Sequence, residues 1–238
     1  VPLEVAPPPK ALVLPHAGYI YSGPVAATGY AALESLRDVV RRVVLLGPSH
    51  RVALSGLALP ASLTFATPLG PVEVDREQWL ALQGRPGVVV DDRPHHLEHS
   101  LEVHLPFLQT VLDRFTLTPL VVGQASAEVV AGVLEAVWGG PETLIVVSSD
   151  LSHYHTYIQA QRCDRATTDQ ILSLHADLDH EQACGATPVN GLLLTARRHH
   201  LEPHLLDLRN SGDTAGDRQR VVGYASISFC ERTPLVSH

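Results

Sequence analysis

Long apolar runs alternate along the chain with segments in which apolar residues recur every three or four positions. Runs such as VVLLG and LIVV show no alternation of apolar and polar residues. This pattern is typical of strands that are buried on both faces of a parallel sheet. It predicts strands over residues 11–15, 43–47, 56–59, 87–90, 117–122, 143–148, 204–208 and 221–228.

The segments between these runs favour helices. The periodic segments predict helices over residues 25–36, 101–114, 127–138, 157–174 and 188–199. Strands that alternate with helices indicate an α/β fold of three layers, α/β/α, with a mostly parallel central sheet. Residues 67–79 have the spacing of a hairpin after a Pro/Gly turn, so we expect a mixed sheet. The polar, glycine-rich residues 210–220 predict a surface loop.

The composition limits the class of protein. With 238 residues and 45% hydrophobic residues, the chain can bury a substantial core, and we expect one domain over residues 1–238 with a proline-rich lead-in over residues 1–10. The formal net charge is −8 and no long basic cluster occurs, which argues against a nucleic-acid partner. No apolar run approaches the roughly 20 residues that span a membrane. Three cysteines without a CxxC motif indicate a reducing compartment, so we expect a cytoplasmic protein.

Three of the predicted strands end in chemically active residues. His16 follows the first run, His50 follows GPS after the second, and Asp150 and His153 follow the run at 143–148. In open α/β sheets, ligands bind beyond the carboxyl ends of the strands. A single histidine in such a place is usually an ordinary loop residue, but three such strand ends together predict one shared site. Neutral imidazole is a common ligand of Zn, Fe, Cu and Ni, so the site favours a metal.

Cys184 is a candidate to complete this site. It precedes a predicted helix, with Thr187 as the expected N-cap and Pro188 as the expected first helical residue. A thiol beside a helix N-terminus is biased toward the thiolate, which binds metals and also acts as a nucleophile. The alternative is that Cys184 is a buried, inert cysteine.

The stretch HHLEHSLEVHLPF is rich in histidine but does not contain HExxH, so it does not predict a zinc protease. His104 falls near the apolar stripe of its predicted helix, and we expect it to be a buried core histidine rather than a ligand. His99 begins that stretch of helix and is predicted to orient a metal ligand without binding the metal itself.

The motifs together resemble one known family. PHAGYIYSGPVAA, LLGPSH, TPLG, EHSLEVHLPF, VVSSDLSHY and CGATPVNGLL occur in this order and resemble the Memo family. Its bacterial and archaeal members are called AmmeMemoRadiSam system protein B, and its human member is a mediator of cell motility. The resemblance covers residues from about 11 to 229.

The resemblance implies a fold similar to that of the class III extradiol dioxygenases. It also implies a pocket in which His16, His50 and Cys184 are the metal ligands, with Tyr21, Asp150 and His153 beside them. In the dioxygenases, the residue that corresponds to His153 acts as acid and base, and the metal is held by two histidines and a glutamate. A cysteine in place of that glutamate suits softer ions. The family further implies iron or copper, a radical-SAM protein as a possible partner, and an aromatic segment that we expect to precede Val1.

The sequence therefore predicts a metal-dependent redox protein with Fe(II) or copper, and with Zn as another possible ion, acting on a small molecule that it does not identify. Two alternatives remain open. One is a hydrolase or transferase with Cys184 as nucleophile and a histidine such as His50 or His153 as base. The other is a non-catalytic binding or signalling module that retains the pocket.

Overall fold

The computed structural model describes residues 7–232. Its centre is a nine-stranded mixed sheet, accompanied by a separate two-stranded hairpin of β4 and β5. The strands are β1 (Pro9–Leu14), β2 (Arg42–Pro48), β3 (Leu57–Leu59), β4 (Thr64–Phe65), β5 (Val72–Glu73), β6 (Val88–Val90), β7 (Thr116–Val122), β8 (Thr143–Ser148), β9 (His153–His155), β10 (Leu201–Asn210) and β11 (Val221–Glu231).

The strand order of the sheet is β10-β11-β1-β8-β2-β7-β3-β6, and β9 pairs with β11. The central strands β1, β8, β2 and β7 are parallel to one another. The antiparallel pairs are β11 with β1, β10 and β9, and β3 with β7. The predicted mixed, mostly parallel sheet is therefore confirmed, and the fully buried strands explain its uninterrupted apolar runs.

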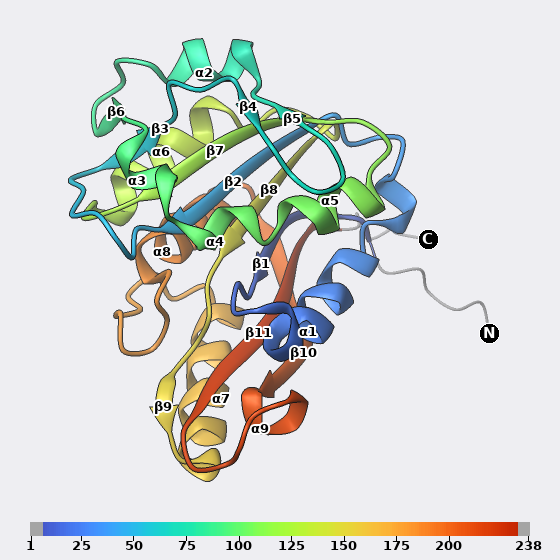
Figure 1. The fold of residues 1–238 in the computed structure, drawn as a ribbon, viewed down its shortest axis with the longest axis vertical. Helices are drawn as coiled ribbons and strands as arrows, with labels where there is room; N and C mark the ends of the chain where they lie inside the picture. The colour runs from blue at the N-terminus through green and yellow to red at the C-terminus, as the bar shows by residue number, and fades with distance from the viewer. Residues whose placement is uncertain (1–6, 233–238) are drawn as a thin grey trace, which may run out of the picture.

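Helices cover both faces of the sheet, as predicted for three layers (Figure 1). Alternate residues of each central strand belong to two separate cores: Leu12 and Val43 face one, whereas Val13 and Val44 face the other. The first core receives α1, α4 and α5, and the second receives α6, α7 and α8. The helices are α1 (Tyr19–Ala31), α2 (Arg76–Leu82), α3 (Arg93–His96), α4 (His99–Glu102), α5 (Leu105–Val111), α6 (Ala127–Ala136), α7 (Tyr157–Leu172), α8 (Ala186–Arg198) and α9 (Ser211–Thr214), with a 3-10 turn η1 (Glu34–Leu36).

Two predicted helices differ from the observed ones by more than two residues. The helix expected at 25–36 is α1, which begins at Tyr19, so Pro24 lies inside it and not in its first turn. The helix expected at 101–114 is two short helices, α4 and α5, with a break around His104. Pro106 explains the break, because a proline ring collides with the carbonyl group four residues earlier in a continuous helix.

Three other expectations are corrected. The residues 67–79 do not change the direction of the main sheet: β4 and β5 form their own hairpin, and the segment continues into α2, which starts after the N-cap Asp75. The predicted loop 210–220 begins with the short helix α9. The lead-in is shorter than residues 1–10, because Pro9 and Lys10 belong to β1, while residues 1–6 lie outside the described chain. Within residues 7–232, no helix is both long and apolar enough to cross a membrane.

Candidate metal centre

Three neighbouring strands are each followed by a polar residue, which stands two positions after the last residue of the strand. His16 follows β1, Asp150 follows β8, and His50 follows β2. Since β8 lies between β1 and β2 and all three are parallel, their carboxyl ends meet at one edge of the sheet. The convergence of these side chains is thus a consequence of the strand order.

Cys184 reaches the same edge from the turn before α8. Its backbone N–H donates to the carbonyl of Asp150 (3.2 Å). The next N–H, that of Gly185, donates to the Ser149 hydroxyl (2.9 Å). A Cβ atom at Gly185 would lie 2.6 Å from the carbonyl oxygen of Ser148, so glycine permits this close approach. The helix begins at Ala186 with Gly185 as N-cap, which corrects the predicted N-cap at Thr187.

The ligand atoms of His16, His50 and Cys184 all lie within 4.8 Å of one another. The Cys184 Sγ atom is 3.5 Å from His16 Nε2, and the two imidazole ring centroids are 5.2 Å apart. In a tetrahedral site with metal–nitrogen bonds of about 2.0–2.1 Å and metal–sulfur bonds of about 2.3 Å, a nitrogen and a sulfur ligand are roughly 3.5 Å apart. The donor types and their spacing therefore fit one metal ion.

Glu98 orients His50 through two hydrogen bonds. The carboxylate accepts hydrogen bonds from the backbone N–H of His50 (2.6 Å) and from its Nδ1 atom (2.9 Å). Burial alone would raise the Glu98 pKa, but these bonds and one from the Ser100 N–H outweigh it and lower the pKa to about 2. An ionised carboxylate only accepts, so the Nδ1 atom of His50 carries a hydrogen and its Nε2 atom is the nitrogen left for a metal ion.

His16 is almost fully buried, and Asp150 holds its backbone. The Asp150 carboxylate accepts from the N–H groups of His16 (2.8 Å) and Ala17 (3.3 Å), and its other oxygen lies 3.8 Å from His16 Nε2. Burial, followed by the neighbouring His50 and His99, lowers the His16 pKa well below its ordinary value. His16 is therefore neutral at physiological pH, as a metal ligand must be.

The electrostatics at Cys184 favour the protonated thiol in the absence of a cation. Burial, followed by the neighbouring Asp150 carboxylate, raises the Cys184 pKa to about 12. Burial likewise raises the pKa of Asp150, an effect that the backbone hydrogen bonds from His16 and Ala17 partly offset. A bound cation is the kind of neighbour that reverses such shifts, because a coordinated thiol loses its proton.

Two further predicted site residues, His153 and Tyr21, lie on β9 and α1. His153 is the first residue of β9 and pairs with Val222 of β11. Tyr21 lies in the first turn of α1 with 38% of its surface exposed. Among residues 7–232, no hydrogen bond joins either side chain to His16, His50 or Cys184, so their predicted roles depend on a substrate.

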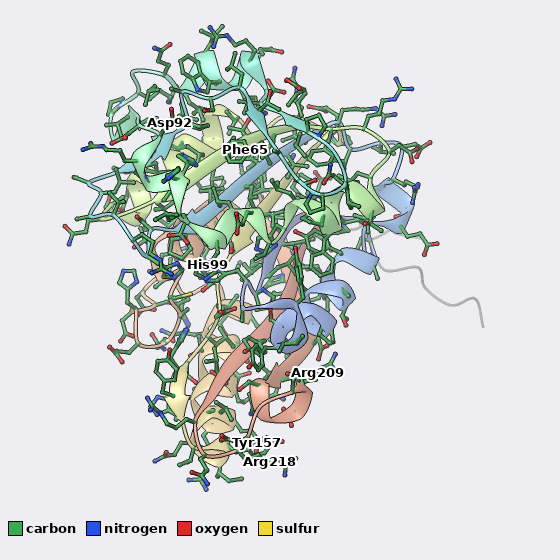
Figure 2. The ribbon with its side chains drawn as sticks, viewed as in Figure 1. Phe65, Asp92, His99, Tyr157, Arg209 and Arg218 are labelled. Carbon is green, nitrogen blue, oxygen red and sulfur yellow. The ribbon has the colours of Figure 1, made fainter. Side chains whose placement is uncertain are left out.

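His99 lies at the start of α4, where the helix crosses the edge of the sheet (Figure 2). Its ring stacks on His50 at 5.1 Å between centroids and meets His16 edge-on at 5.5 Å. Its Nδ1 atom is 3.5 Å from Glu98 Oε1, and His50, Glu98 and His99 form a second group of closely spaced ligand atoms. His99 therefore packs directly on both candidate imidazoles, and its predicted role in orienting a metal ligand stays a prediction.

Two residues that contact the candidate imidazoles, Glu98 and Ser148, were not predicted as site residues from the sequence. The Ser148 hydroxyl lies 2.6 Å from His16 Nδ1. The final position of a buried strand gave no sign of this contact. Glu98 is the N-cap of α4, and its carboxylate accepts a hydrogen bond from the Ser100 N–H. Its position directly before a helix is the sequence signal that could have identified it.

A cavity of about 740 Å³ adjoins the centre, with His50 and Cys184 in its wall. Its other sides include Leu54, Gln124 and His180. The candidate ligands therefore face a space large enough for a small organic molecule.

Fold and site together define a three-layer α/β protein with a His/His/Cys centre at the carboxyl edge of its sheet. The model of one family, described as Memo-like protein, matches residues 4–228, and this chain belongs to the Memo family.

Relatives in the archaea support this placement. A MEMO1 family protein of Sulfolobus acidocaldarius is 35% identical over 231 residues, which cover 91% of this chain and 81% of that protein. One of Methanosarcina barkeri is 37% identical over 232 residues, covering 90% and 84%. The crystal structure of an uncharacterised Escherichia coli K12 protein, JW3007, has a TM-score of 0.60 at 14% identity, covering 91% of this chain and 98% of that one. That likeness concerns the fold alone.

Proposed function

We propose that the protein is a metal-binding redox protein that holds Fe(II) or copper on His16, His50 and Cys184, with Zn as another ion that the site accommodates. The observation that carries this proposal is the set of three ligand atoms within 4.8 Å of one another. Two imidazoles and one thiolate suit a borderline or soft ion better than a hard one such as Mg²⁺.

The neighbouring residues support a reaction at this centre. A bound iron or copper ion would supply one-electron chemistry and a Lewis acid. The cavity beside His50 and Cys184 would bind the substrate and limit the access of water. His153 would carry a proton to or from that substrate, and the Tyr21 hydroxyl would hydrogen-bond to it. Asp150 would keep His16 in place through its two backbone hydrogen bonds.

An anaerobic titration with Co²⁺ tests the proposed ligand set. Thiolate coordination gives Co²⁺ a sulfur-to-metal charge-transfer band, and a tetrahedral site gives intense visible bands. We expect both in the wild-type protein and loss of the charge-transfer band in Cys184→Ser. Cys163→Ser is the matched control, because Cys163 is exposed on α7. A charge-transfer band that survives Cys184→Ser would refute Cys184 as a ligand.

One observation favours a second candidate function. The 3.5 Å contact between Cys184 Sγ and His16 Nε2 is also that of a cysteine nucleophile beside its base. His16 rather than His50 or His153 would then be the base. The raised pKa of Cys184 weighs against this alternative. Rapid alkylation of Cys184 by iodoacetamide in metal-free protein at pH 7 would support the nucleophile, whereas slow alkylation supports the metal centre.

A further inference from the structure

A series of buried hydrogen bonds runs from Tyr30 of α1 through His104, the N-cap of α5, to the candidate ligand His16. The Tyr30 hydroxyl contacts His104 Nδ1 (2.9 Å), and His104 Nε2 contacts the Ser148 hydroxyl (2.9 Å). That hydroxyl also contacts His16 Nδ1 (2.6 Å) and the carbonyl oxygen of Ser100 (2.6 Å). The side chains are all buried, with Tyr30 and His104 each 1% exposed.

The proton positions in this series of hydrogen bonds follow from one atom, the Ser100 carbonyl oxygen, that can only accept. The Ser100 carbonyl has no hydrogen to give, so the single Ser148 hydroxyl proton must point at it. The Ser148 oxygen then has only lone pairs for its other two partners. Both His16 Nδ1 and His104 Nε2 must therefore carry hydrogens and donate.

The far end of the chain is consistent with this assignment. Burial lowers the His104 pKa to about 3, so this imidazole is neutral and has one N–H. With that hydrogen on Nε2, the Nδ1 atom accepts from the Tyr30 hydroxyl. Each contact in this series thereby has one donor and one acceptor, with the Ser148 oxygen accepting twice, which is the condition for a stable buried polar network.

We propose that Ser148, oriented by the Ser100 carbonyl and by His104, is a positioning residue that holds His16 as its Nδ1–H tautomer and keeps its Nε2 lone pair free toward Cys184. This inference deepens the proposed function. It rests on that function because the Nε2 lone pair is held free in order to bind the proposed metal ion. His104 is thus buried as the sequence predicts, yet it is linked to the site through Ser148.

The segment Glu98–Ser100 couples the two imidazoles. The Ser100 N–H donates to Glu98, which holds Nδ1 of His50, while the Ser100 carbonyl accepts from Ser148, which holds Nδ1 of His16. Both candidate ligands are therefore oriented from one peptide segment at the start of α4, and both expose Nε2.

The tautomer is measurable without any metal. Two-bond ¹H–¹⁵N correlation spectra of metal-free protein labelled with ¹⁵N-histidine distinguish a protonated from a bare ring nitrogen, and His16→Gln and His104→Gln variants assign the two signals. We expect His16 to be protonated on Nδ1 and His104 on Nε2. A wild-type His16 protonated on Nε2 would overturn the proposal, and this result needs no variant that might fail to fold.

A pair of serine variants then tests the role of Ser148. Ser148→Ala should allow His16 to populate the Nε2–H tautomer and should weaken Co²⁺ binding by about tenfold or more, in the range of lost outer hydrogen bonds to metal ligands. Ser226→Ala is the control, since Ser226 is a fully buried strand serine that also donates to a backbone carbonyl, that of Val25. Ser226→Ala should change neither the His16 tautomer nor the affinity for Co²⁺. A Ser148→Ala protein with an unchanged His16 tautomer would overturn the positioning role.

The two levels of the hypothesis fail separately. If wild-type protein binds no metal but His16 is protonated on Nδ1 and responds to Ser148→Ala, the proposed function fails and the positioning role stands. If metal binds and His16 carries its proton on Nε2 in the metal-free protein, the positioning role fails alone.

Discussion

The Cys184 sulfur lies 3.5 Å from His16 Nε2, although 168 residues separate the two in the chain. The contact exists because β1 and β8 are adjacent parallel strands, and the turn before α8 folds back onto the residues that follow β8. A buried thiol and a bare imidazole nitrogen at this distance need a shared partner. That partner is a proton in the metal-free protein and, in our proposal, a metal ion in the active one.

The first prediction concerns the thiolate. Replacing Cys184 by serine removes the soft ligand and leaves a hydroxyl that is a poor donor to Fe(II) or Cu(I). We expect affinity to fall at least about tenfold, which corresponds to about 1.4 kcal/mol. Anaerobic competition titration against a chelator of known affinity measures it, and unchanged affinity would exclude the cysteine as a ligand.

The second prediction concerns the carboxylate behind His50. Glu98→Gln removes the charge that fixes His50 as its Nδ1–H tautomer, and affinity for the metal should fall by about 10- to 100-fold. Glu102→Gln is the matched control, because Glu102 lies four residues later on the exposed side of α4. Equal losses in the two variants would show that general negative charge, and not the contact with His50, is responsible.

The third prediction concerns the close approach of α4 to β2. A Cβ atom at Gly47 would lie 2.7 Å from Ser100 Oγ and 2.8 Å from Leu101 Cδ2. Gly47→Ala should therefore displace the segment that orients both imidazoles, lower the stability by about 1–3 kcal/mol and weaken metal binding. Gly132→Ala in α6, where a Cβ meets nothing within 4 Å, should instead stabilise the protein by about 0.4–1 kcal/mol. Urea denaturation measures whether the free energy of unfolding falls in Gly47→Ala and rises in Gly132→Ala.

The fourth prediction concerns acid stability. Because burial holds the His104 pKa near 3, well below the ordinary 6.5, the unfolded chain binds this proton first. The stability from a neutral His104 is complete above pH 6.5 and is lost as the pH falls toward 3, at up to about 1.4 kcal/mol per pH unit. The lowered pKa of His16 likewise makes the protein less stable as the pH falls.

Urea denaturation of metal-free protein between pH 7 and 4.5 measures this slope. His104→Gln should be less stable than wild type at pH 7 and should lose less stability on acidification. His175→Gln, which changes an exposed histidine after α7, should keep the wild-type slope. Identical slopes for wild type and His104→Gln would contradict a neutral, buried His104.

The sequence predicts the strands and the site edge well, because fully buried parallel strands need uninterrupted apolar runs. His16, His50 and Asp150 could be found from sequence since each closely follows such a run, two residues beyond the end of its strand. The roles of Glu98 and Ser148 could not, because they depend on how α4 crosses the end of β2, which no local pattern encodes. The start of α1 was misplaced since Pro24, a usual sign of a first turn, lies in mid-helix.

The single lysine of the chain is another feature that pattern alone did not explain. Lys10 is 7% exposed, and its ammonium group donates to the carbonyls of Trp138 (2.6 Å), Gly140 (2.8 Å) and Thr143 (2.8 Å). Lys10→Met would leave these carbonyls without a donor.

The fifth prediction separates proton transfer from metal binding. His153→Ala should retain the metal and lose turnover of an identified substrate by the ~10²- to 10⁴-fold that is typical of a missing general acid or base. His16→Ala should lose both. Metal content and activity measured side by side decide between these roles, and a metal-free His153→Ala protein would make His153 a ligand.

The presence of a transition metal on His16, His50 and Cys184 is the claim on which the rest depends. The most direct test is elemental analysis of wild-type and His16→Ala protein, both purified and reconstituted without oxygen and both shown to be folded by circular dichroism. We predict close to one iron or copper ion per wild-type chain and almost none in His16→Ala. A folded wild-type protein that binds no transition metal, or a His16→Ala protein with the same content as wild type, would contradict the account.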